Sequence, residues 1–321
     1  MESPILRDAP AVWLAQTKFH PPRLRDDVLP RPRLLAALRD ALASHPLTLL
    51  SAPAGYGKTT LLGEWVQANR KLQTPNSKVQ TPNAQAADDL KFEVGGLEFS
   101  WLSLDEDDND PLRFLAAVVA ALQRIKPGFG VAVQASLNEA ASPLDLSEIG
   151  ARMRRVAVVL INDILETLPD PFVLILDDLH LITAAAAFVA LDTLVERLPP
   201  QMRFVAATRH DPPLALARLR ARGQLAELRL ADLRFTHDEA AEFLNDRLRL
   251  GLAPDDLLAL ETRTEGWAVG LRLTAGSLDG LPTASDRAAF LARLVQTERH
   301  AFDFLAGEVL DRQPPDARAF L

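Results

Sequence analysis

The strongest constraint on the fold is the run from Leu47 to Thr60, LTLLSAPAGYGKTT, where a short apolar segment leads into a glycine-containing loop and then into a helix. Gly55 and Gly57 permit backbone angles that a Cβ forbids, so successive N–H groups can turn inward around phosphate oxygens. The helix that follows adds the positive end of its dipole. This order predicts a nucleoside triphosphate site. The alternative is a strand-to-helix turn that binds nothing.

The loop residues have distinct expected roles. We expect Lys58 to reach the β- and γ-phosphates and the Thr59 hydroxyl to occupy one Mg²⁺ coordination position. At the start of the loop Ala52 replaces the glycine of the stricter pattern, which a negative φ tolerates. The implied cofactors are ATP or ADP with Mg²⁺, and the candidate contact residues of this segment are Ala52, Gly55, Tyr56, Gly57, Lys58, Thr59 and Thr60.

A second motif lies at Phe172 to Asp178, where an apolar strand delivers two carboxylates at its C-terminal end. Ligands bind at that edge of a parallel sheet. Asp177 is predicted to hold Mg²⁺, directly or through water, and Asp178 to orient or deprotonate an attacking water. Two solvated acids that cap the next helix are the alternative. The upstream loop favours the metal and water roles, because the two motifs together are more specific than either alone.

A third apolar segment, Phe204 to Arg209, also ends in polar residues. Thr208 or Arg209 is a candidate sensor of the γ-phosphate, and the Arg209 cation is a candidate catalytic group because it would stabilise charge on the transferring phosphoryl group. An ion pair between Arg209 and a carboxylate such as Asp211 is an equally good reading of the sequence.

The fold class follows from the alternation of these elements. Strand-like segments at 99–104, 172–176 and 204–207 alternate with helix-like segments at 114–125 and 184–197, which indicates an α/β fold, a P-loop NTPase parallel sheet with flanking helices. The polar stretch 73–87 repeats the tetrapeptide QTPN and is interpreted as a surface insertion or a linker. From Thr236 onward the apolar spacing is helical.

Composition narrows the function. The net charge of −8 and a pI near 5.3 disfavour nucleic acid as a direct partner. The absence of cysteine excludes disulfides, thiolate metal sites and thiol nucleophiles. Neither a signal peptide nor a membrane-length apolar run is found, so we expect a cytoplasmic protein.

Several segments together resemble the large ATP-binding transcriptional regulators of the LuxR family, which belong to the STAND class of signal-transducing P-loop ATPases and include the maltose regulator. Their order along nearly the whole chain is more diagnostic than any one of them. The matching segments are 17–22 (TKFHPP), 31–35 (RPRLL), 51–65, 101–105 (WLSLD) with 108–111 (DNDP), 174–182, 211–214 (DPPL), 232–235 (DLRF) and 264–267 (TEGW).

The resemblance implies a domain order: a leader at 1–30, a P-loop NTPase domain at 31–235 with a polar insertion at about 71–98, a small helical lid domain at 236–285, and the start of a winged-helix domain at 286–321. It places Val28 and Leu29 in the adenine pocket. It favours a strand-end loop and helix cap for the acid cluster 105–111, over a metal site, and core packing for Trp267.

The implied function is an ATP-binding regulatory switch with slow hydrolysis. ADP holds the resting form, and ATP with an unidentified inducer promotes self-association or association with a full-length homologue. We expect no direct DNA binding and no membrane association by this chain, since the family's sensor and DNA-binding parts are not recognisable in it. The alternatives are a DNA-dependent AAA-type ATPase resembling an origin loader, and an inactive remnant. Intact Lys58, Thr59, Asp177 and Asp178 argue against the remnant.

Overall fold

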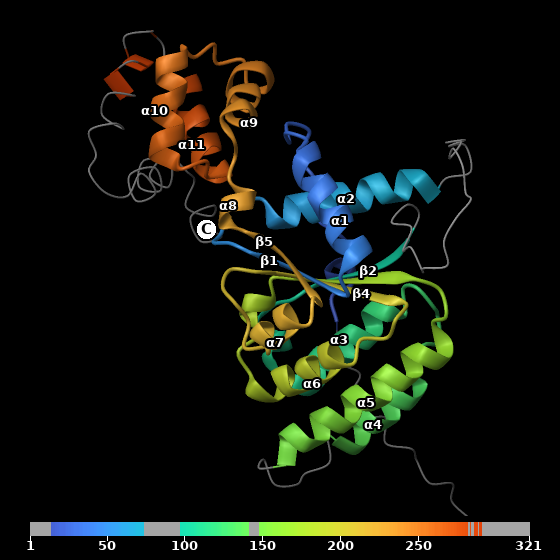
Figure 1. Ribbon diagram of the computed structural model, residues 1–321. Coiled ribbons are helices and arrows are strands. Elements are labelled where there is room, and N and C mark those ends of the chain that lie inside the picture. The colour runs from blue at the N-terminus through green and yellow to red at the C-terminus, as the bar shows by residue number, and fades with distance from the viewer. Residues whose placement is uncertain are drawn as a thin grey trace, which may run out of the picture. The chain divides into compact units, whose positions relative to one another are not determined.

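The computed structural model describes residues 14–73, 97–140 and 148–290 except 282, 284, 285 and 288, and its ribbon is drawn in Figure 1. The chain divides into two compact units. The first comprises Met1–Arg23, Leu35–Ser51 and Thr59–Leu228, and the second comprises Leu24–Leu34, Ala52–Lys58 and Arg229–Leu321.

The first unit contains a five-stranded sheet in the order β2-β3-β4-β1-β5. The strands are β1 (Leu47–Ser51), β2 (Glu98–Ser103), β3 (Phe172–Asp177), β4 (Met202–Thr208) and β5 (Leu225–Arg229). β1 pairs with β4, β4 with β3, and β3 with β2, all in parallel. The predicted parallel α/β sheet is therefore confirmed. Because Ser51 lies opposite Thr208 and Ser103 opposite Asp177, the carboxyl ends of these strands meet at one edge.

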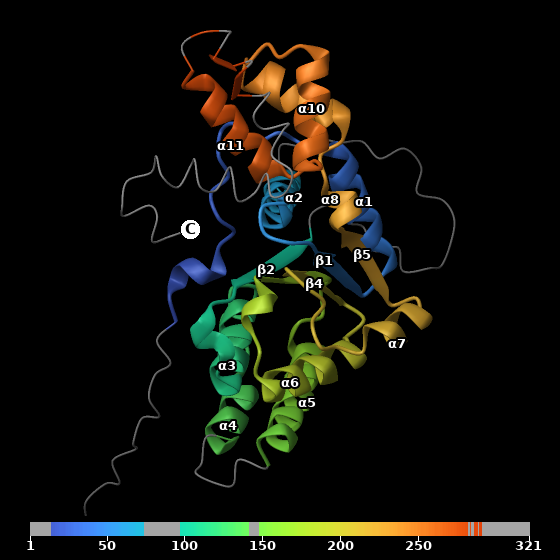
Figure 2. The same cartoon turned by 90° about the vertical axis from the view of Figure 1, so that its left-hand side faces the viewer.

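Helices cover both faces of this sheet, which explains why every residue of β1 and of β3 is buried. α1 (Pro32–Ser44) and α2 (Lys58–Gln73) lie on one face, and α3 (Pro111–Leu122) and α6 (Ala185–Glu196) lie on the other, as Figures 1 and 2 show. α5 (Ile149–Thr167) packs on α6, and α4 (Val131–Ala140) packs on α5. α7 (Leu216–Ala221) connects β4 to β5.

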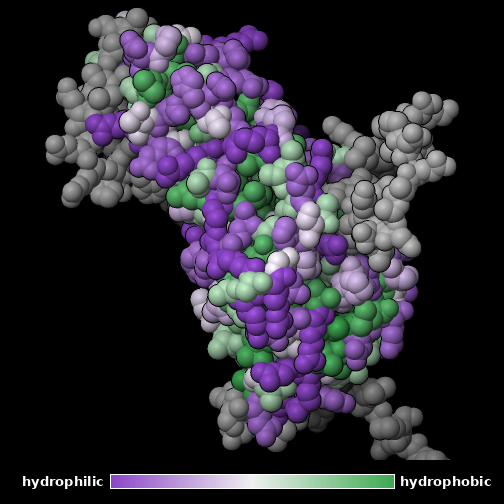
Figure 3. All heavy atoms as spheres, in the orientation of Figure 1, coloured by the Kyte–Doolittle hydropathy of each residue, from purple (hydrophilic) through white to green (hydrophobic). Residues whose placement is uncertain are grey.

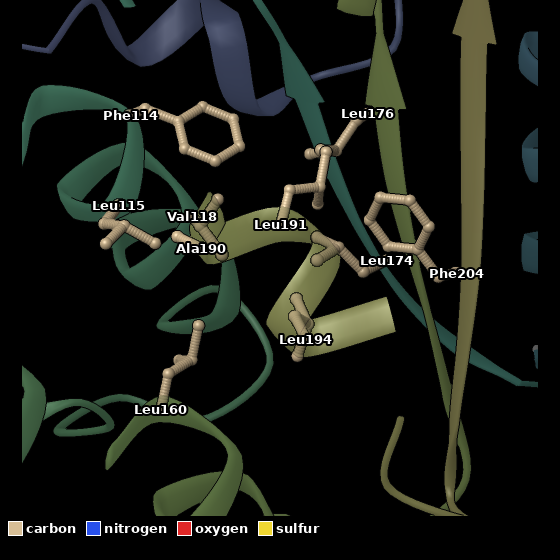
Figure 4. Close-up of a pocket in the computed structure, with 10 residues that line it drawn as sticks. All are labelled: Phe114, Leu115, Val118, Leu160, Leu174, Leu176, Ala190, Leu191, Leu194 and Phe204. Carbon is tan, nitrogen blue, oxygen red and sulfur yellow. The ribbon is translucent and has the colours of Figure 1, made fainter. Parts of the chain in front are cut away.

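The core of this unit is closely packed between the sheet and α3, α5 and α6. The one void drawn in Figure 4 has a volume of only about 10 Å³, roughly the minimum for a single water molecule. It is therefore a packing defect and not a ligand site. Apolar side chains line it: Phe114, Leu115, Val118, Leu160, Leu174, Leu176, Ala190, Leu191, Leu194 and Phe204.

The second unit is mainly helical after Thr236, as the apolar spacing predicted. It contains α8 (Leu230–Leu233), α9 (His237–Ala241), a π-helical turn (Glu242–Arg247), α10 (Pro254–Thr264) and α11 (Ala268–Asp279). Thr236 caps α9 in a reciprocal arrangement with Glu239. The apolar faces of these helices share one core with Leu29, which comes from the segment before α1. The expected winged-helix start at 286–321 lies mostly outside the described residues, as does most of the polar insertion.

Among the coloured residues in the view of Figure 3, hydrophilic ones predominate and hydrophobic ones form separate patches between them. The large hydrophobic side chains that are exposed in the described ranges are scattered along the sequence: Val131, Leu165, Leu258 and Val269. Within the same ranges, no helix is both long enough and apolar enough to cross a bilayer.

Candidate nucleotide site

The glycine-containing loop joins β1 to α2, and both of its glycines have the left-handed backbone that motivated the prediction. Gly55 has φ 81° and Gly57 has φ 80°. Such angles strain residues that carry a Cβ, whereas glycine adopts them freely. Ala52 is buried and is not among the residues with positive φ, so the missing glycine at that position causes no backbone conflict.

Lys58, the first residue of α2, is held by its own loop. Its Nζ donates to the carbonyl oxygens of Ala52 and Pro53 at 2.6 and 2.9 Å, and the side chain is 8% exposed. Carbonyl oxygens are neutral acceptors, and an ammonium group forms stronger hydrogen bonds with anionic oxygens. The cation is therefore kept at the loop by contacts that a phosphate oxygen can replace.

In the first unit, Thr59 and Asp177 form the most specific contact of the site. Asp177 ends β3 and is 2% exposed. Its Oδ1 accepts a hydrogen bond from Thr59 Oγ1 at 3.0 Å and another from the Asp178 N–H at 3.1 Å. The Thr59 hydroxyl and the Asp177 carboxylate, which are 118 residues apart in the sequence, are therefore hydrogen-bonded to each other at the carboxyl edge of the sheet.

Asp178 follows in an unusual conformation, with φ 59° and ψ 36°. Its side chain is 44% exposed, and its Oδ1 lies 3.8 Å from Nδ1 of the buried His180. The two neighbouring acids therefore differ: Asp177 is buried and hydrogen-bonded, while Asp178 faces solvent.

The two candidate sensors of the γ-phosphate, Thr208 and Arg209 at the end of β4, lie in different environments. Thr208 is fully buried, and its hydroxyl donates to the His210 carbonyl at 2.7 Å. Arg209 is exposed and forms no hydrogen bond or ion pair with any residue that the structure describes. Asp211 accepts from Ser51 Oγ at 3.2 Å and lies 3.8 Å from Arg220. The alternative ion pair between Arg209 and Asp211 is therefore not formed.

The remaining candidate residues occupy varied environments. Val28, Tyr56 and Thr60 are half-buried, whereas Leu29 is 3% exposed and belongs to the core of the second unit. Burial raises the pKa of the Tyr56 hydroxyl above its ordinary value; the Arg234 cation opposes this shift and the Glu265 carboxylate adds to it. Tyr56 therefore stays protonated at neutral pH.

The acid cluster that follows β2 is structural. Asp105 caps the short 3-10 helix Glu106–Asn109, and Asp110 caps α3 by accepting from the Arg113 N–H at 2.8 Å. Asp108 is fully buried in an ion pair with Lys18. Among the described residues, no group of three or more metal-ligating side chains is found. The capping contacts of Asp105 and Asp110 agree with the expected strand-end loop and helix cap.

Known proteins provide the next comparison. No protein-family model matches the chain. Over 94% of its length it is 35% identical to the transcriptional regulator MalT of Yersinia enterocolitica. It is 34% identical to the MalT proteins of Serratia proteamaculans and Yersinia pestis, again over 94% of its length. The chain is similar to MalT. It spans about 29% of the length of these relatives, so the predicted resemblance to this kind of regulator is confirmed over that part of their length.

The solved structures that resemble the chain are less similar to it in sequence. The Walker-type ATPase PABY2304 of Pyrococcus abyssi is 14% identical, with a TM-score of 0.48 over 92% of this chain and 79% of that one. The Drosophila ORC structure bound to DNA is also 14% identical, with a TM-score of 0.46 over 98% of this chain and 74% of that one. Scores below 0.5 do not discriminate between functions.

Two features of the candidate site were not predicted from the sequence. Trp267 packs in the second unit as expected, but its indole also donates to the Ala54 carbonyl of the loop at 2.9 Å. Arg31 is buried and binds the carbonyls of Leu233 and Arg234 at 2.9 and 2.6 Å. Both residues belong to segments that carry the family resemblance. Membership of such a segment does not indicate which atoms a side chain contacts, so neither contact could be inferred from it.

Proposed function

We propose that the chain binds ATP or ADP with Mg²⁺ as the nucleotide-switch region of a MalT-like transcriptional regulator. The observation that carries this proposal is the hydrogen bond between Thr59 Oγ1 and Asp177 Oδ1 at 3.0 Å, because the two motifs assign these side chains to one magnesium ion. A hydroxyl and a carboxylate oxygen are the hard ligands that Mg²⁺ prefers, so the donor set fits the metal. When bound, Mg²⁺ supplies positive charge to the β- and γ-phosphate oxygens.

In this proposal, residues of the chain bind the phosphates and the base, orient the attacking water and stabilise the charge of the transition state. Lys58 exchanges its carbonyl acceptors for phosphate oxygens, and the N–H groups of the loop complete the phosphate cradle. Asp178, which is solvent-exposed beside buried Asp177, orients the attacking water and accepts its proton. Arg209, an exposed cation after β4, stabilises charge on the transferring phosphoryl group. The adenine base lies near Val28 and Leu29.

We further propose that slow hydrolysis times a change of assembly. In this scheme residues 31–235 act as the ATPase domain and 236–285 as a helical lid, ADP holds the resting form, and ATP with an inducer promotes self-association. The relatives that support this scheme are transcriptional regulators by name. Size-exclusion chromatography with light scattering, in MgADP and in MgATP, tests it. An identical mass in both nucleotides, with and without candidate inducers, contradicts the assembly step.

The alternative of a DNA-dependent ATPase is disfavoured by charge. A protein that tracks phosphate backbones needs a basic surface, whereas this chain carries 43 acidic against 35 basic residues. The inactive remnant is disfavoured because Thr59 and Asp177 are not only present but also in contact.

Nucleotide binding is tested with Lys58→Ala. We expect calorimetric titration to show tight MgADP binding by the wild-type chain and at least tenfold weaker binding by the variant, because charge-assisted hydrogen bonds to phosphate are lost. Lys126→Ala is the control, since Lys126 is a surface lysine outside the loop that donates to the Thr167 carbonyl. Equal affinity in wild type and Lys58→Ala contradicts the proposed function.

The two acids are tested as a pair. Asp177→Asn should weaken Mg²⁺-dependent binding, because it removes charge from the metal position. Asp178→Asn should keep nucleotide affinity and lower turnover, since a water-orienting group acts mainly in the transition state. Wild-type hydrolysis by Asp178→Asn contradicts the role of this residue.

A further inference from the structure

In the second unit, a tight turn directly precedes Trp267, which is the N-cap residue of α11. Glu265 has φ 50° and Gly266 has φ 68°, two consecutive left-handed residues. The Gly266 carbonyl accepts from the Phe235 N–H at 2.8 Å, and a Cβ on Gly266 would lie 2.5 Å from the Phe235 oxygen. The Glu265 carboxylate is also paired with Arg234 at 2.9 Å. The direction in which Trp267 leaves this turn is therefore fixed.

Trp267 and α11 contact two successive carbonyls of the phosphate loop. The indole Nε1 donates to Ala54 O at 2.9 Å, and the Val269 N–H donates to Gly55 O at 3.2 Å. The indole is 9% exposed and lies so close to Gly270 that a Cβ there would be 2.3 Å from its Cε3. The Val269 N–H is one of the first-turn donors of α11, which have no partner within the helix. The loop supplies that partner.

These two hydrogen bonds orient N–H groups of the loop. A peptide unit is planar and trans, so its C=O and N–H point in opposite directions. Holding Ala54 O toward Trp267 directs the Gly55 N–H away from it, and holding Gly55 O toward Val269 directs the Tyr56 N–H away from α11. We propose that Trp267 is a positioning residue for the phosphate loop, which sets the direction of the N–H donors that receive phosphate. This inference rests on the proposed function, in which the loop binds nucleotide.

The contact between Trp267 and the phosphate loop places different steric requirements on Gly55 and Gly57. A Cβ on Gly55 would lie 2.4 Å from Trp267 Nε1 and 2.9 Å from Val269 Cβ, whereas a Cβ on Gly57 would meet nothing within 4 Å. Gly57 is therefore needed for its backbone angle alone. Gly55 is needed both for its angle and for the close approach of Trp267.

The test compares Trp267→Phe with Trp101→Phe. Each variant keeps an aromatic ring and loses one indole hydrogen bond, and in Trp101 the lost bond is a donation to Ser103 Oγ at 2.8 Å in the first unit. Calorimetry is carried out with MgADP and with adenosine, which has no phosphate. We expect Trp267→Phe to raise the Kd for MgADP about fivefold, the usual effect of one net hydrogen bond. Adenosine affinity should not change, and Trp101→Phe should leave both affinities unchanged.

A merely structural role of Trp267 would weaken adenosine and MgADP alike, and this outcome overturns the proposal, as does wild-type MgADP affinity in Trp267→Phe. If Trp267→Phe does not fold, Val269→Pro takes its place. It deletes the N–H that binds Gly55 O, while Ala268→Pro puts the same ring one residue earlier in the first turn, where proline is tolerated. Weaker MgADP binding by Val269→Pro alone supports the proposal, and equal binding by both overturns it. Failure of the proposed function has a different signature, namely no MgADP binding by the wild-type chain.

Discussion

Replacing Lys18 with methionine should destabilise the first unit, because it removes the cation that is hydrogen-bonded to the buried carboxylate of Asp108. Lys18 is 7% exposed and its ammonium contacts Asp108, which is fully buried. It also lies 2.8 Å from Asp105. Methionine keeps most of the aliphatic stem, so the change removes charge and hydrogen bonds with little change in packing.

The size of the effect follows from what remains around Asp108. Breaking a buried ion pair costs about 3–5 kcal/mol. Asp108 Oδ2 still accepts from the Asp105 N–H at 2.9 Å, and Arg113 Nε lies 3.8 Å from Oδ1, so we expect a loss near the lower limit, about 3 kcal/mol. For a unit of this size, that corresponds to a fall in melting temperature of about 6–12 °C.

Urea denaturation followed by circular dichroism and tryptophan fluorescence measures the loss. The double variant Lys18→Met/Asp108→Asn should lose less than the sum of the single variants, because the second change removes the unpaired charge. A loss under about 1 kcal/mol in Lys18→Met, or strict additivity in the double variant, would refute the reasoning.

The second contact of Lys18, its ion pair with Asp105, predicts a dependence of stability on pH. Partial burial raises the pKa of Asp105, but the Lys18 hydrogen bond and charge outweigh it, and the net pKa lies below the ordinary value. A carboxyl group with a lowered folded-state pKa stabilises the fold above its unfolded pKa of about 3.9, and the stabilisation is lost as pH falls through the folded value. The difference in stability between wild type and Lys18→Met should therefore narrow in acid below about pH 4.

Three further outcomes are expected. Leu174→Ala, at the small void of Figure 4, should cost about 2–5 kcal/mol in urea denaturation, because it enlarges a cavity in a packed core; a cost under about 1 kcal/mol would show that the core relaxes around it. Arg31→Lys should lower the thermal stability of the second unit, because one ammonium cannot reproduce the fork that binds Leu233 O, Arg234 O and Glu239 together; calorimetric scanning checks this. The chain should not shift sequence-specific DNA in a gel at physiological salt, even with ATP, given its net charge of −8; tight, sequence-dependent retardation would favour the DNA-dependent ATPase.

The sheet was predictable because its central strands are continuous apolar runs next to recognisable motifs. β1, β3 and β4 are buried on both faces of the sheet. Strands of this kind are recognised in a sequence as continuous apolar runs, without an alternation of polar and apolar residues. β5, with the sequence LAELR, mixes charged and apolar residues at the sheet edge and only some of its residues are buried. It gives a weak signal, and it was missed.

Contacts between distant residues were not predictable from the sequence. Lys18 and Asp108 are 90 positions apart, and Trp267 and Ala54 are 213 positions apart. Both contacts depend on how loops return to the same place in three dimensions, which local periodicity does not encode. The candidate site residues can be predicted from the sequence because the phosphate loop and the acidic strand end are local patterns. Their roles remain proposals that the variants above test.

The left-handed backbone at Asp178 limits which residues evolution can place there. A non-glycine residue with φ 59° is uncommon, and aspartate and asparagine adopt this region more readily than other side chains. Asparagine and glycine should fold without difficulty at this position, while valine and isoleucine should not, whatever their effect on chemistry. A saturation library at position 178, sorted first for folding and then for turnover, should therefore contain few folded variants. Among these, aspartate alone combines a carboxylate with a side chain that adopts the left-handed region with little strain.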